Sequence, residues 1–260
     1  MIEISPDVLP KTPSFRLDGL RAVVTGAGQG IGLAAAAALA EAGAEVTLLA
    51  RGEEAINRAA KSICEAGGKA NAVSLDVTNL SAVSSFFKEN PAFHIVINNA
   101  GTNRPLHMND VTEEDFDAVM DLNVKGSFFV AQKAAQVMIA ENIKGSIIHM
   151  GSQMGHVGAI NRTLYCASKW AIEGLNKAMA LDLAQYGIRS NVIAPTFIKT
   201  PLTKAFLDDK EFLDKVMDKI KLGRLGEVED LMGAVVFLAS GASALMTGSS
   251  LLIDGGWTAE

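Results

Sequence analysis

The sequence predicts an α/β fold, a doubly wound parallel sheet in one three-layer domain, and three observations support this class. Short apolar runs alternate with helical runs along the chain, and the connections between them are short, as in successive βαβ units. Hydrophobic residues make up 49% of the 260 residues but aromatic residues only 6%, which suits a sheet buried on both faces by helices with small side chains. A chain of this length can bury one core without a disulfide or a metal.

The individual elements follow from this alternation. Seven apolar runs predict strands, which lie at residues 22–25, 45–50, 70–75, 94–98, 146–150, 191–194 and 251–254. Helices are expected between them, at residues 31–42, 53–66, 81–89, 116–140 and 163–185. Right-handed crossovers would place these helices on both faces of the sheet.

Two segments stand apart from this pattern. Residues 1–16 contain three prolines and predict an extended N-terminal arm, which leaves residues 17–260 as the single domain. Residues 201–222 repeat apolar side chains at helical spacing between charged ones, and they interrupt the alternation of strands and helices. An insertion at the carboxyl edge of the sheet is placed to act as a substrate lid, although a surface helical pair or an oligomer contact would show the same pattern.

Charge and composition argue against several classes of function. The formal net charge is −6 and no Lys/Arg cluster is present, which disfavours nucleic acids and anionic membranes as partners. No apolar run is long enough to span a bilayer, and the acidic, proline-containing start resembles neither a signal peptide nor a transit peptide, so we expect a cytoplasmic protein. Cys64 and Cys166 lie far apart and predict reduced thiols, and the four histidines show no metal-ligand spacing, so no metal site is expected.

A glycine-rich turn follows the first predicted strand. Residues 25–32 read Thr-Gly-Ala-Gly-Gln-Gly-Ile-Gly and open the first helix. Glycines let the backbone approach a pyrophosphate, while the helix N-terminus offers free N–H groups and a partial positive charge. A structural turn needs only one or two glycines, so this turn predicts a dinucleotide site formed by Gly26, Gln29, Gly30, Ile31 and Gly32.

The residues after the second and third strands bear on the choice of cofactor. NAD-preferring sites place an acid at the tip of the second strand, whereas an arginine accommodates the 2′-phosphate of NADP. Arg51 follows this strand, which favours NADP. NAD stays possible, because Arg51 could be a solvated loop residue and Glu53 or Glu54 could reach the ribose. Asp76, followed by Val77, could bind the adenine amine or cap the next turn.

A second set of polar residues has the composition of a proton-transfer site. Tyr165 and Lys169 are four residues apart in a helical run and therefore share a helix face, and a nearby ammonium favours the ionised form of a tyrosine. Ser152 follows the fifth strand, where a hydroxyl can polarise a carbonyl, and Asn123 could hold a water chain that leads to the lysine. Residues 98–101, Asn-Asn-Ala-Gly, suit packing against a bound cofactor or an ordinary turn.

Together and in this order, these motifs resemble those of the short-chain dehydrogenase/reductase family, whose members have one Rossmann domain of about this length. The resemblance runs from residue 17 to the end. It rests on the glycine turn, Asp76, residues 98–101, Asn123, Ser152, the motif Tyr165-Cys166-Ala167-Ser168-Lys169, Thr247-Gly248 and Asp254-Gly255-Gly256. One departure is visible: members usually have Pro-Gly after the sixth strand, whereas this chain has Pro195-Thr196, which puts the shape of this loop in doubt.

The resemblance implies an oxidoreductase that transfers a hydride between a nicotinamide cofactor and a CH–OH carbon. It implies that Tyr165 is the general acid/base, that Lys169 lowers its pKa and binds the nicotinamide ribose, that Ser152 holds the substrate oxygen, and that Asn123 anchors a proton relay. It also implies cofactor contacts by Arg51, Asp76, Val77, Asn99, Ala100, Gly101, Pro195, Ile198 and Thr200. Members commonly form tetramers through their long helices, so a homotetramer is expected.

The substrate is expected to be a small molecule. The residues that flank the serine and tyrosine, with one aromatic residue of the later loop, are its candidate ligands: Gln153, His156, Asn161, Arg162 and Phe197. This polar set favours a polyol, a sugar or a sugar acid, although it could equally cap loops or form an interface. A 3-oxoacyl-thioester (acyl-carrier protein) reductase is the alternative enzyme, for which Arg104 and Lys204 supply only a thin basic patch. A non-catalytic nucleotide-sensing scaffold is the alternative of another class, and such a protein would be expected to lack Tyr165 or Lys169.

Overall fold

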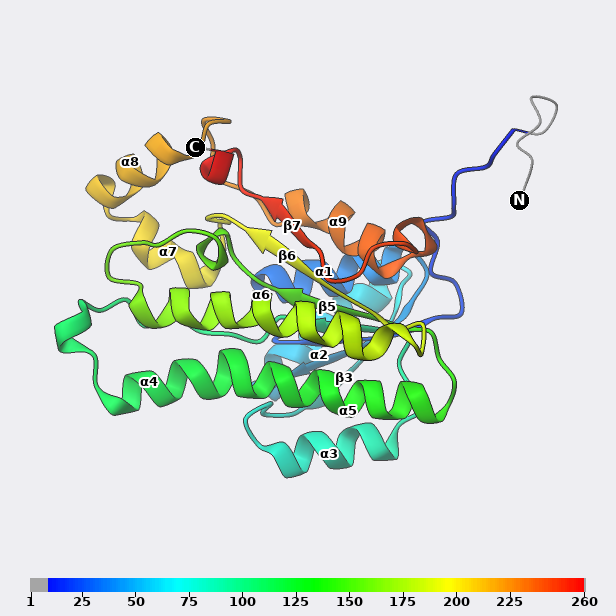
Figure 1. Ribbon diagram of the computed structural model, residues 1–260. Helices are drawn as coiled ribbons and strands as arrows, with labels where there is room; N and C mark the ends of the chain where they lie inside the picture. The colour runs from blue at the N-terminus through cyan, green and yellow to red at the C-terminus, as the bar shows by residue number, and fades with distance from the viewer. Residues whose placement is uncertain (1–8, 260) are drawn as a thin grey trace.

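The strands form a single seven-stranded parallel sheet in the order β3-β2-β1-β4-β5-β6-β7 (Figure 1). The structure is a computed structural model that describes residues 9–259, apart from the side chain of Ala205. All seven predicted strands are present within two residues of their expected ends, and they are β1 (Arg21–Thr25), β2 (Glu45–Ala50), β3 (Lys69–Ser74), β4 (Ile95–Asn98), β5 (Ser146–Met150), β6 (Arg189–Pro195) and β7 (Ser250–Ile253).

The chain reverses its path across the sheet after β3. It runs outward from β1 through β2 to β3, then returns to β4 on the other side of β1 and continues to β7. In such sheets the carboxyl ends of the two strands at the reversal border the crevice in which ligands bind. Here those strands are β1 and β4, so Thr25 and Asn98 mark the expected position of the site.

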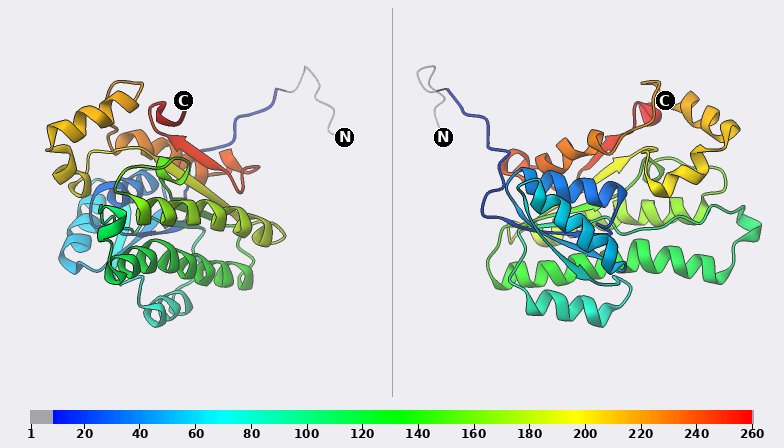
Figure 2. Two further views of the ribbon diagram at one scale, coloured as in Figure 1. Left: turned by 60° about the vertical axis from the view of Figure 1, so that its left-hand side comes forward. Right: turned by 180° about the vertical axis from the view of Figure 1, so that it is seen from behind.

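Helices cover both faces of the sheet, which confirms the three-layer α/β architecture (Figure 2). One face packs against α1, α2 and α9, and the other against α3, α5 and the last turns of α6. The bounds of these helices are α1 (Gly30–Glu41), α2 (Glu53–Glu65), α3 (Leu80–Glu89), α5 (Ser127–Ala140), α6 (Thr163–Ala184) and α9 (Glu229–Ala239). No helix within residues 9–259 is both long and apolar enough to cross a membrane.

Two helical features differ from the prediction. The helix expected over residues 116–140 begins earlier, as α4 (Glu113–Met120), because Thr112 and Asp115 form a capping box. A π-helical stretch (Asp121–Gly126) then separates α4 from α5. Helix α9 was not predicted, since it is mostly apolar around its circumference and gives little helical periodicity; it packs beside α1 in the core.

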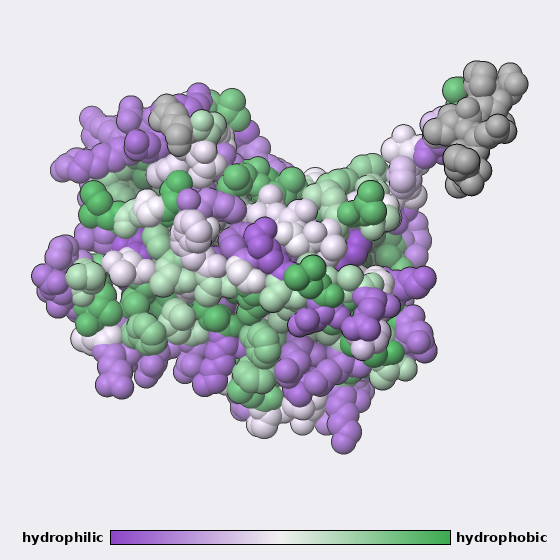
Figure 3. All heavy atoms as spheres, in the orientation of Figure 1, coloured by the Kyte–Doolittle hydropathy of each residue, from purple (hydrophilic) through white to green (hydrophobic). Residues whose placement is uncertain are grey.

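The insertion at residues 201–222 forms two short helices, as its spacing predicts. They are α7 (Pro201–Leu207) and α8 (Lys210–Lys219), and they project from one end of the molecule (Figure 1). Val216 and Ile220 are buried against Leu225, while the outer surface of α8 is strongly hydrophilic (Figure 3).

The predicted N-terminal arm is only partly covered. Residues 1–8 lie outside the described residues, and residues 9–16 are exposed and contain neither helix nor strand. The arm meets the domain where the Phe15 ring lies 6.3 Å from the ring of Phe237 on α9.

Candidate active site

A cavity of about 500 Å³ opens at the carboxyl ends of the central strands. Its wall includes Ser152 and every residue predicted to contact the cofactor: Gly26, Gln29, Gly30, Ile31, Gly32, Arg51, Asp76, Val77, Asn99, Ala100, Gly101, Tyr165, Lys169, Pro195, Ile198 and Thr200. These residues come from segments that are far apart in the sequence. The fold thus brings together the residues that the motifs had grouped.

The glycine turn is shaped for close approach of the backbone to a ligand. Gly26 and Gly30 have φ angles of 65° and 56°, which glycine adopts without strain. A Cβ atom on Gly32 would lie 2.5 Å from the side-chain nitrogen of Asn99. No side chain caps α1, so the first N–H groups of this helix are left for a ligand.

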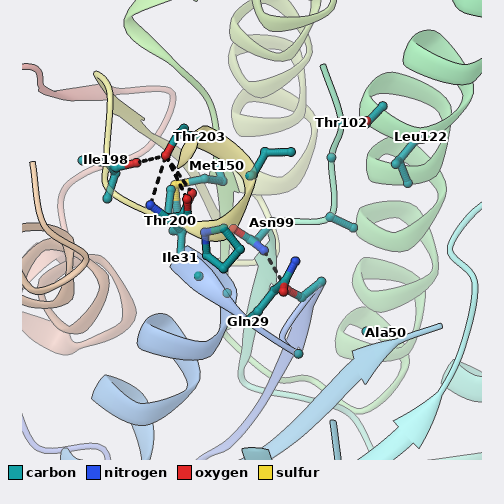
Figure 4. A pocket seen from close by; sticks show the side chains of 18 of the residues that line it. Gln29, Ile31, Ala50, Asn99, Thr102, Leu122, Met150, Ile198, Thr200 and Thr203 are labelled. Carbon is teal, nitrogen blue, oxygen red and sulfur yellow. Dashed lines mark hydrogen bonds between the residues drawn. The ribbon is translucent and has the colours of Figure 1, made fainter. Parts of the chain in front are cut away.

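Hydrogen bonds fix the spacing between the ends of β1 and β4. Thr25 Oγ1 accepts from the N–H groups of Asn99 and Ala100, both at 3.0 Å. The Asn99 side chain donates to the Thr25 carbonyl at 3.0 Å. It also donates to the Gly26 carbonyl at 3.2 Å, a bond drawn as a dashed line in Figure 4. The two walls of the crevice are therefore joined directly through Asn99.

Arg51 and Asp76 line the cavity after β2 and β3. The exposed Arg51 guanidinium has no hydrogen-bond or ion-pair partner among the described residues. Asp76 Oδ1 accepts from the backbone and hydroxyl of Thr78, at 2.9 and 2.8 Å, and so caps the turn. Glu53 and Glu54 do not line the cavity. The end of the cavity next to β2 and β3 therefore presents an unpaired cation, which suits the binding of a phosphate group.

Tyr165 and Lys169 lie one turn apart on α6 and reach the cavity from the side where Ser152 follows β5. Lys169 Nζ lies 5.5 Å from the centre of the Tyr165 ring and donates to the Met150 carbonyl at 2.7 Å. Ser152 lies close enough to Tyr165 to lower the pKa of its hydroxyl, and Ser152 Oγ donates to Gln153 Oε1 at 2.8 Å. The three polar groups thus converge on one small region of the cavity.

Burial controls the ionisation of this group. It raises the pKa of Tyr165, while the Ser152 hydrogen bond and the charge of Arg162 act in the opposite direction. The Tyr–Lys spacing predicts a contribution that lowers this pKa, whereas desolvation raises the pKa and outweighs the groups that act in the opposite direction. Burial also lowers the pKa of Lys169 to about 8, although the charge of Glu173 favours the ammonium.

Asn123 lies behind the cavity wall in the π-helical stretch and is 2% exposed. Its Oδ1 accepts from the Thr102 N–H at 2.8 Å, and its Nδ2 donates to the Thr102 carbonyl at 2.9 Å and to Ser168 Oγ at 3.0 Å. Ser168 in turn donates to the Tyr165 carbonyl at 2.8 Å. The side chain therefore ties the loop after β4 to the helix that carries Tyr165, and π-helical stretches of this kind are frequent at functional sites.

The loop after β6 forms the remaining wall. Thr203 Oγ1 donates to the Ile198 carbonyl at 2.6 Å and accepts from the Thr200 N–H at 3.0 Å (Figure 4). Thr196, where family members usually have glycine, also lines the cavity. Its Oγ1 is buried and has no hydrogen-bond partner among the described residues, so the protein alone leaves this hydroxyl unsatisfied.

The residues predicted to bind substrate do not line the cavity: Gln153, His156, Asn161, Arg162 and Phe197. Gln153 is 1% exposed and contacts Ser152, and its Nε2 has no partner among the described residues. His156 Nε2 lies 3.2 Å from Oε1 of Glu173. Glu173 stands on α6, one turn after Lys169. Asn161 is exposed, with a φ of 58° that marks a turn.

The remaining two predicted substrate residues, Arg162 and Phe197, belong to an aromatic cluster beneath the insertion. The Phe197 ring lies 5.6 Å from that of Phe212 and 5.7 Å from that of Trp257. The Arg162 guanidinium lies 5.3 Å from the ring centre of Phe206 and 5.8 Å from that of Phe212. This cluster joins α7 and α8 to the domain.

Several cavity residues carried no sequence signal. Thr102, Leu122 and Met150 line the wall, and their types and positions belong to no motif. Only the fold, which places the π-helical stretch and the end of β5 beside the crevice, identifies them. Within residues 9–259 no group of three or more His, Cys, Asp or Glu side chains could hold a metal ion.

Comparisons with known proteins agree with this geometry. Residues 26–258 match the family model described as Enoyl-(Acyl carrier protein) reductase. The chain is 38% identical to gluconate 5-dehydrogenase of Gluconobacter oxydans, over 94% of this chain and 96% of that protein. It is 37% identical to (3R)-3-hydroxyacyl-CoA dehydrogenase of Canis lupus familiaris, over 93% and 97%.

A solved structure shows the same arrangement in three dimensions. Gluconate 5-dehydrogenase from Burkholderia cenocepacia, in complex with NADP and tartrate, matches with a TM-score of 0.91 and 38% identity, over 95% of this chain and 98% of that one. Fold, motif order and these similarities agree, and the chain belongs to the short-chain dehydrogenase/reductase family of oxidoreductases.

Proposed function

We propose that this protein is an NADP-dependent oxidoreductase that interconverts a secondary alcohol and a ketone on a polyol, a sugar or a sugar acid. The observation that carries this proposal is the convergence of Ser152, Tyr165 and Lys169 on the cavity that the glycine turn also lines. A proton-transfer group and a dinucleotide cradle in one cavity are the two requirements for hydride-transfer chemistry.

The cavity fits NADP at three places along its length. The uncapped N-terminus of α1 and the glycines with positive φ suit the pyrophosphate. The unpaired Arg51 suits the 2′-phosphate. The orphaned hydroxyl of Thr196, with Ile198 and Thr200, suits a carboxamide at the other end. When bound, the nicotinamide supplies the hydride donor or acceptor.

The protein's own part is to hold the alcohol and move its proton. Ser152 and Tyr165 both line the cavity, so a substrate oxygen between them would accept a hydrogen bond from the Ser152 hydroxyl while it exchanges its proton with Tyr165. Lys169 supplies positive charge near the Tyr165 ring and favours the phenolate as the proton leaves. Asn123, through Ser168, fixes the turn of α6 on which Tyr165 stands.

Relatives with sugar-type names support the substrate class. They include gluconate 5-dehydrogenase of Gluconobacter oxydans and galactitol 2-dehydrogenase of Rhizobium johnstonii. The similarity to (3R)-3-hydroxyacyl-CoA dehydrogenase of Canis lupus familiaris makes a hydroxyacyl thioester the second candidate substrate. Against it, Arg104 is paired with Asp115 at 2.7 Å and is not free to bind a phosphorylated carrier.

Three further properties belong to this proposal. We propose that residues 201–222 act as a substrate lid, because Leu202 and Thr203 line the cavity from α7. We propose a homotetramer, supported by exposed Phe128 and Trp170 on the long helices α5 and α6 and by apolar side chains along that face (Figure 3). A cytoplasmic location is consistent with the reduced state expected of Cys64 and Cys166.

Replacement of Tyr165 by phenylalanine tests the mechanism. The change removes only the hydroxyl, so we expect kcat to fall by at least about 100-fold while the Kd for NADP stays within about threefold. Turnover is measured over polyols, aldonates and hydroxyacyl thioesters with NADP and NAD in parallel. Unchanged turnover in Tyr165→Phe would refute the mechanism, and faster turnover with NAD throughout would refute the role given to Arg51.

A non-catalytic scaffold gives a different outcome in the same assays. It would bind NADP yet turn over none of these substrates in the wild-type protein. The presence of both Tyr165 and Lys169 in the cavity argues for catalysis.

A further inference from the structure

Arg162 is a buried cation without a counter-charge. The residue is 6% exposed, and no carboxylate of the described residues lies within ion-pair distance of it. Among the described residues, its guanidinium donates one hydrogen bond, to the neighbouring carbonyl of Asn161 at 3.1 Å. A guanidinium has five N–H donors, and burying a charge that is neither paired nor fully hydrogen-bonded is unfavourable.

Arg189, a second partly buried arginine, shows how this fold can satisfy such a group. It donates to the carbonyls of Leu238 and Ser240, at 2.9 and 3.3 Å, and to Ser243 Oγ at 2.9 Å. Arg162 has no comparable set of acceptors within residues 9–259. None of its nitrogens is among the fully buried unpartnered atoms, so its unused N–H groups keep a small exposed area.

The contacts that Arg162 makes leave most of its N–H donors unused, since one donor bonds to the Asn161 carbonyl. The rings of Phe206 on α7 and Phe212 on α8 lie 5.3 and 5.8 Å from the guanidinium carbon. Stacking of this kind uses the face of the guanidinium, whereas carboxylates bind along its edge with two parallel hydrogen bonds. A cation held against these two rings therefore keeps N–H donors with which it can bind an anion.

The position of Arg162 relates it to the reacting group. It stands one helical turn before Tyr165, and its carbonyl accepts from the Cys166 N–H at 2.7 Å. Its charge is near enough to the Tyr165 hydroxyl to lower the pKa of that hydroxyl. Arg162 itself does not line the cavity, but α7 connects the two places, because Leu202 lines the cavity and Phe206, one turn further along α7, lies over the Arg162 guanidinium.

We propose that Arg162 binds the carboxylate of the substrate and thereby selects sugar acids over neutral polyols. This inference rests on the proposed function and names the substrate class within it. A carboxylate a few carbons from the reacting CH–OH group would pair with the guanidinium while the alcohol lies at Tyr165 and Ser152. A neutral polyol would leave the buried cation unpaired.

The test compares matched acid and polyol pairs. Initial rates with NADP are measured for D-gluconate against D-sorbitol, and for D-galactonate against D-galactitol, in wild type, Arg162→Met, Arg162→Lys and Arg58→Met. Arg58→Met is the control, since it removes the same charge from an exposed arginine on α2. Thermal unfolding of each variant reports any loss of fold.

We expect wild type to prefer the acid in at least one pair. Arg162→Met should raise the KM for that acid by about 10- to 100-fold and the KM for the matched polyol by much less, while any effect on kcat through the Tyr165 hydroxyl should be equal for the two substrates. Arg162→Lys keeps the positive charge but loses the planar pair of N–H donors that bind a carboxylate. The KM of this variant for the acid should therefore lie between those of wild type and Arg162→Met. Arg58→Met should resemble wild type.

Two kinds of result would overturn the assignment and leave the proposed function intact. One is a wild-type preference for the polyol or for neither partner of a pair. The other is an equal loss on acid and polyol in both Arg162 variants, which would show that the arginine serves only to hold the aromatic cluster. Absence of turnover on every alcohol in the wild-type protein would instead refute the proposed function itself.

Discussion

Replacement of Lys169 by methionine should stabilise the protein while it impairs catalysis. Lys169 is 8% exposed, and burial lowers its pKa from 10.5 to about 8. A shift of this size corresponds to about 3 kcal/mol of cost for keeping the ammonium charged at neutral pH, at about 1.4 kcal/mol per pKa unit. Methionine has a similar volume and carries no charge, so most of this cost should disappear.

The expected gain at pH 7 is therefore about 2 kcal/mol, because the lost hydrogen bond to the Met150 carbonyl offsets part of the difference. The sign of the pH dependence follows from linkage. Between the folded pKa of about 8 and the unfolded value of 10.5 the unfolded chain binds more protons, so wild-type stability rises with pH in this window. The variant lacks this contribution, and its advantage should shrink as the pH rises through the window.

Urea unfolding of wild type and Lys169→Met at pH 7 and pH 10.5 measures both effects. Lys125→Met, at an exposed lysine paired with Asp121, is the control and should change stability by less than about 0.5 kcal/mol. A variant that is less stable than wild type at pH 7, or a difference that does not vary with pH, would refute the reasoning. Either result would mean that Glu173 fully compensates the buried charge.

Two further changes test other parts of the structure. Gly32→Ala should weaken NADP binding at least about tenfold, because the added Cβ would lie 2.5 Å from the Asn99 side chain. Titration calorimetry measures the NADP affinity, with Gly174→Ala as the control because a Cβ there meets nothing within 4 Å. Equal affinities of the two variants would show that the glycine turn can relax. Burial lowers the pKa of His149 to about 4, so wild-type protein should lose up to about 3 kcal/mol of stability as the pH falls from 6.5 through 4. His149→Gln should lose less over that range in unfolding curves, and an identical acid slope would exclude His149 as the cause.

The sequence predicted those parts of the fold and site that depend on short stretches of chain. The seven strands, the glycine turn and the Tyr165–Lys169 pair are each encoded within a few residues, and their spacing carries the chemistry. Thr25 is only the first residue of the glycine turn in the sequence, yet it accepts the hydrogen bonds that hold Asn99. Such a role depends on a contact between distant segments and cannot be read from either segment alone.

The direction of the Tyr165 pKa shift illustrates the same limit. The neighbouring lysine is visible in the sequence, but the burial that raises the Tyr165 pKa is a property of the assembled fold. Likewise, the sequence places Arg162 beside Tyr165 without showing that no carboxylate of the described residues reaches it. Helix α9 was missed because a helix that is apolar on most sides has no amphipathic pattern.

The neighbouring positions of β1 and β4 have a consequence for folding. These strands pair side by side although the hydrogen bonds between their ends join residues 74 positions apart, and such non-local pairing slows folding because a long loop must close first. The crevice therefore exists only after the two halves of the sheet have met. A dinucleotide that binds there binds the native chain and not its partly folded forms. At a hundredfold excess over its Kd it adds about 2.7 kcal/mol to the stability of the native protein. Its supply during synthesis should therefore raise the yield of native protein.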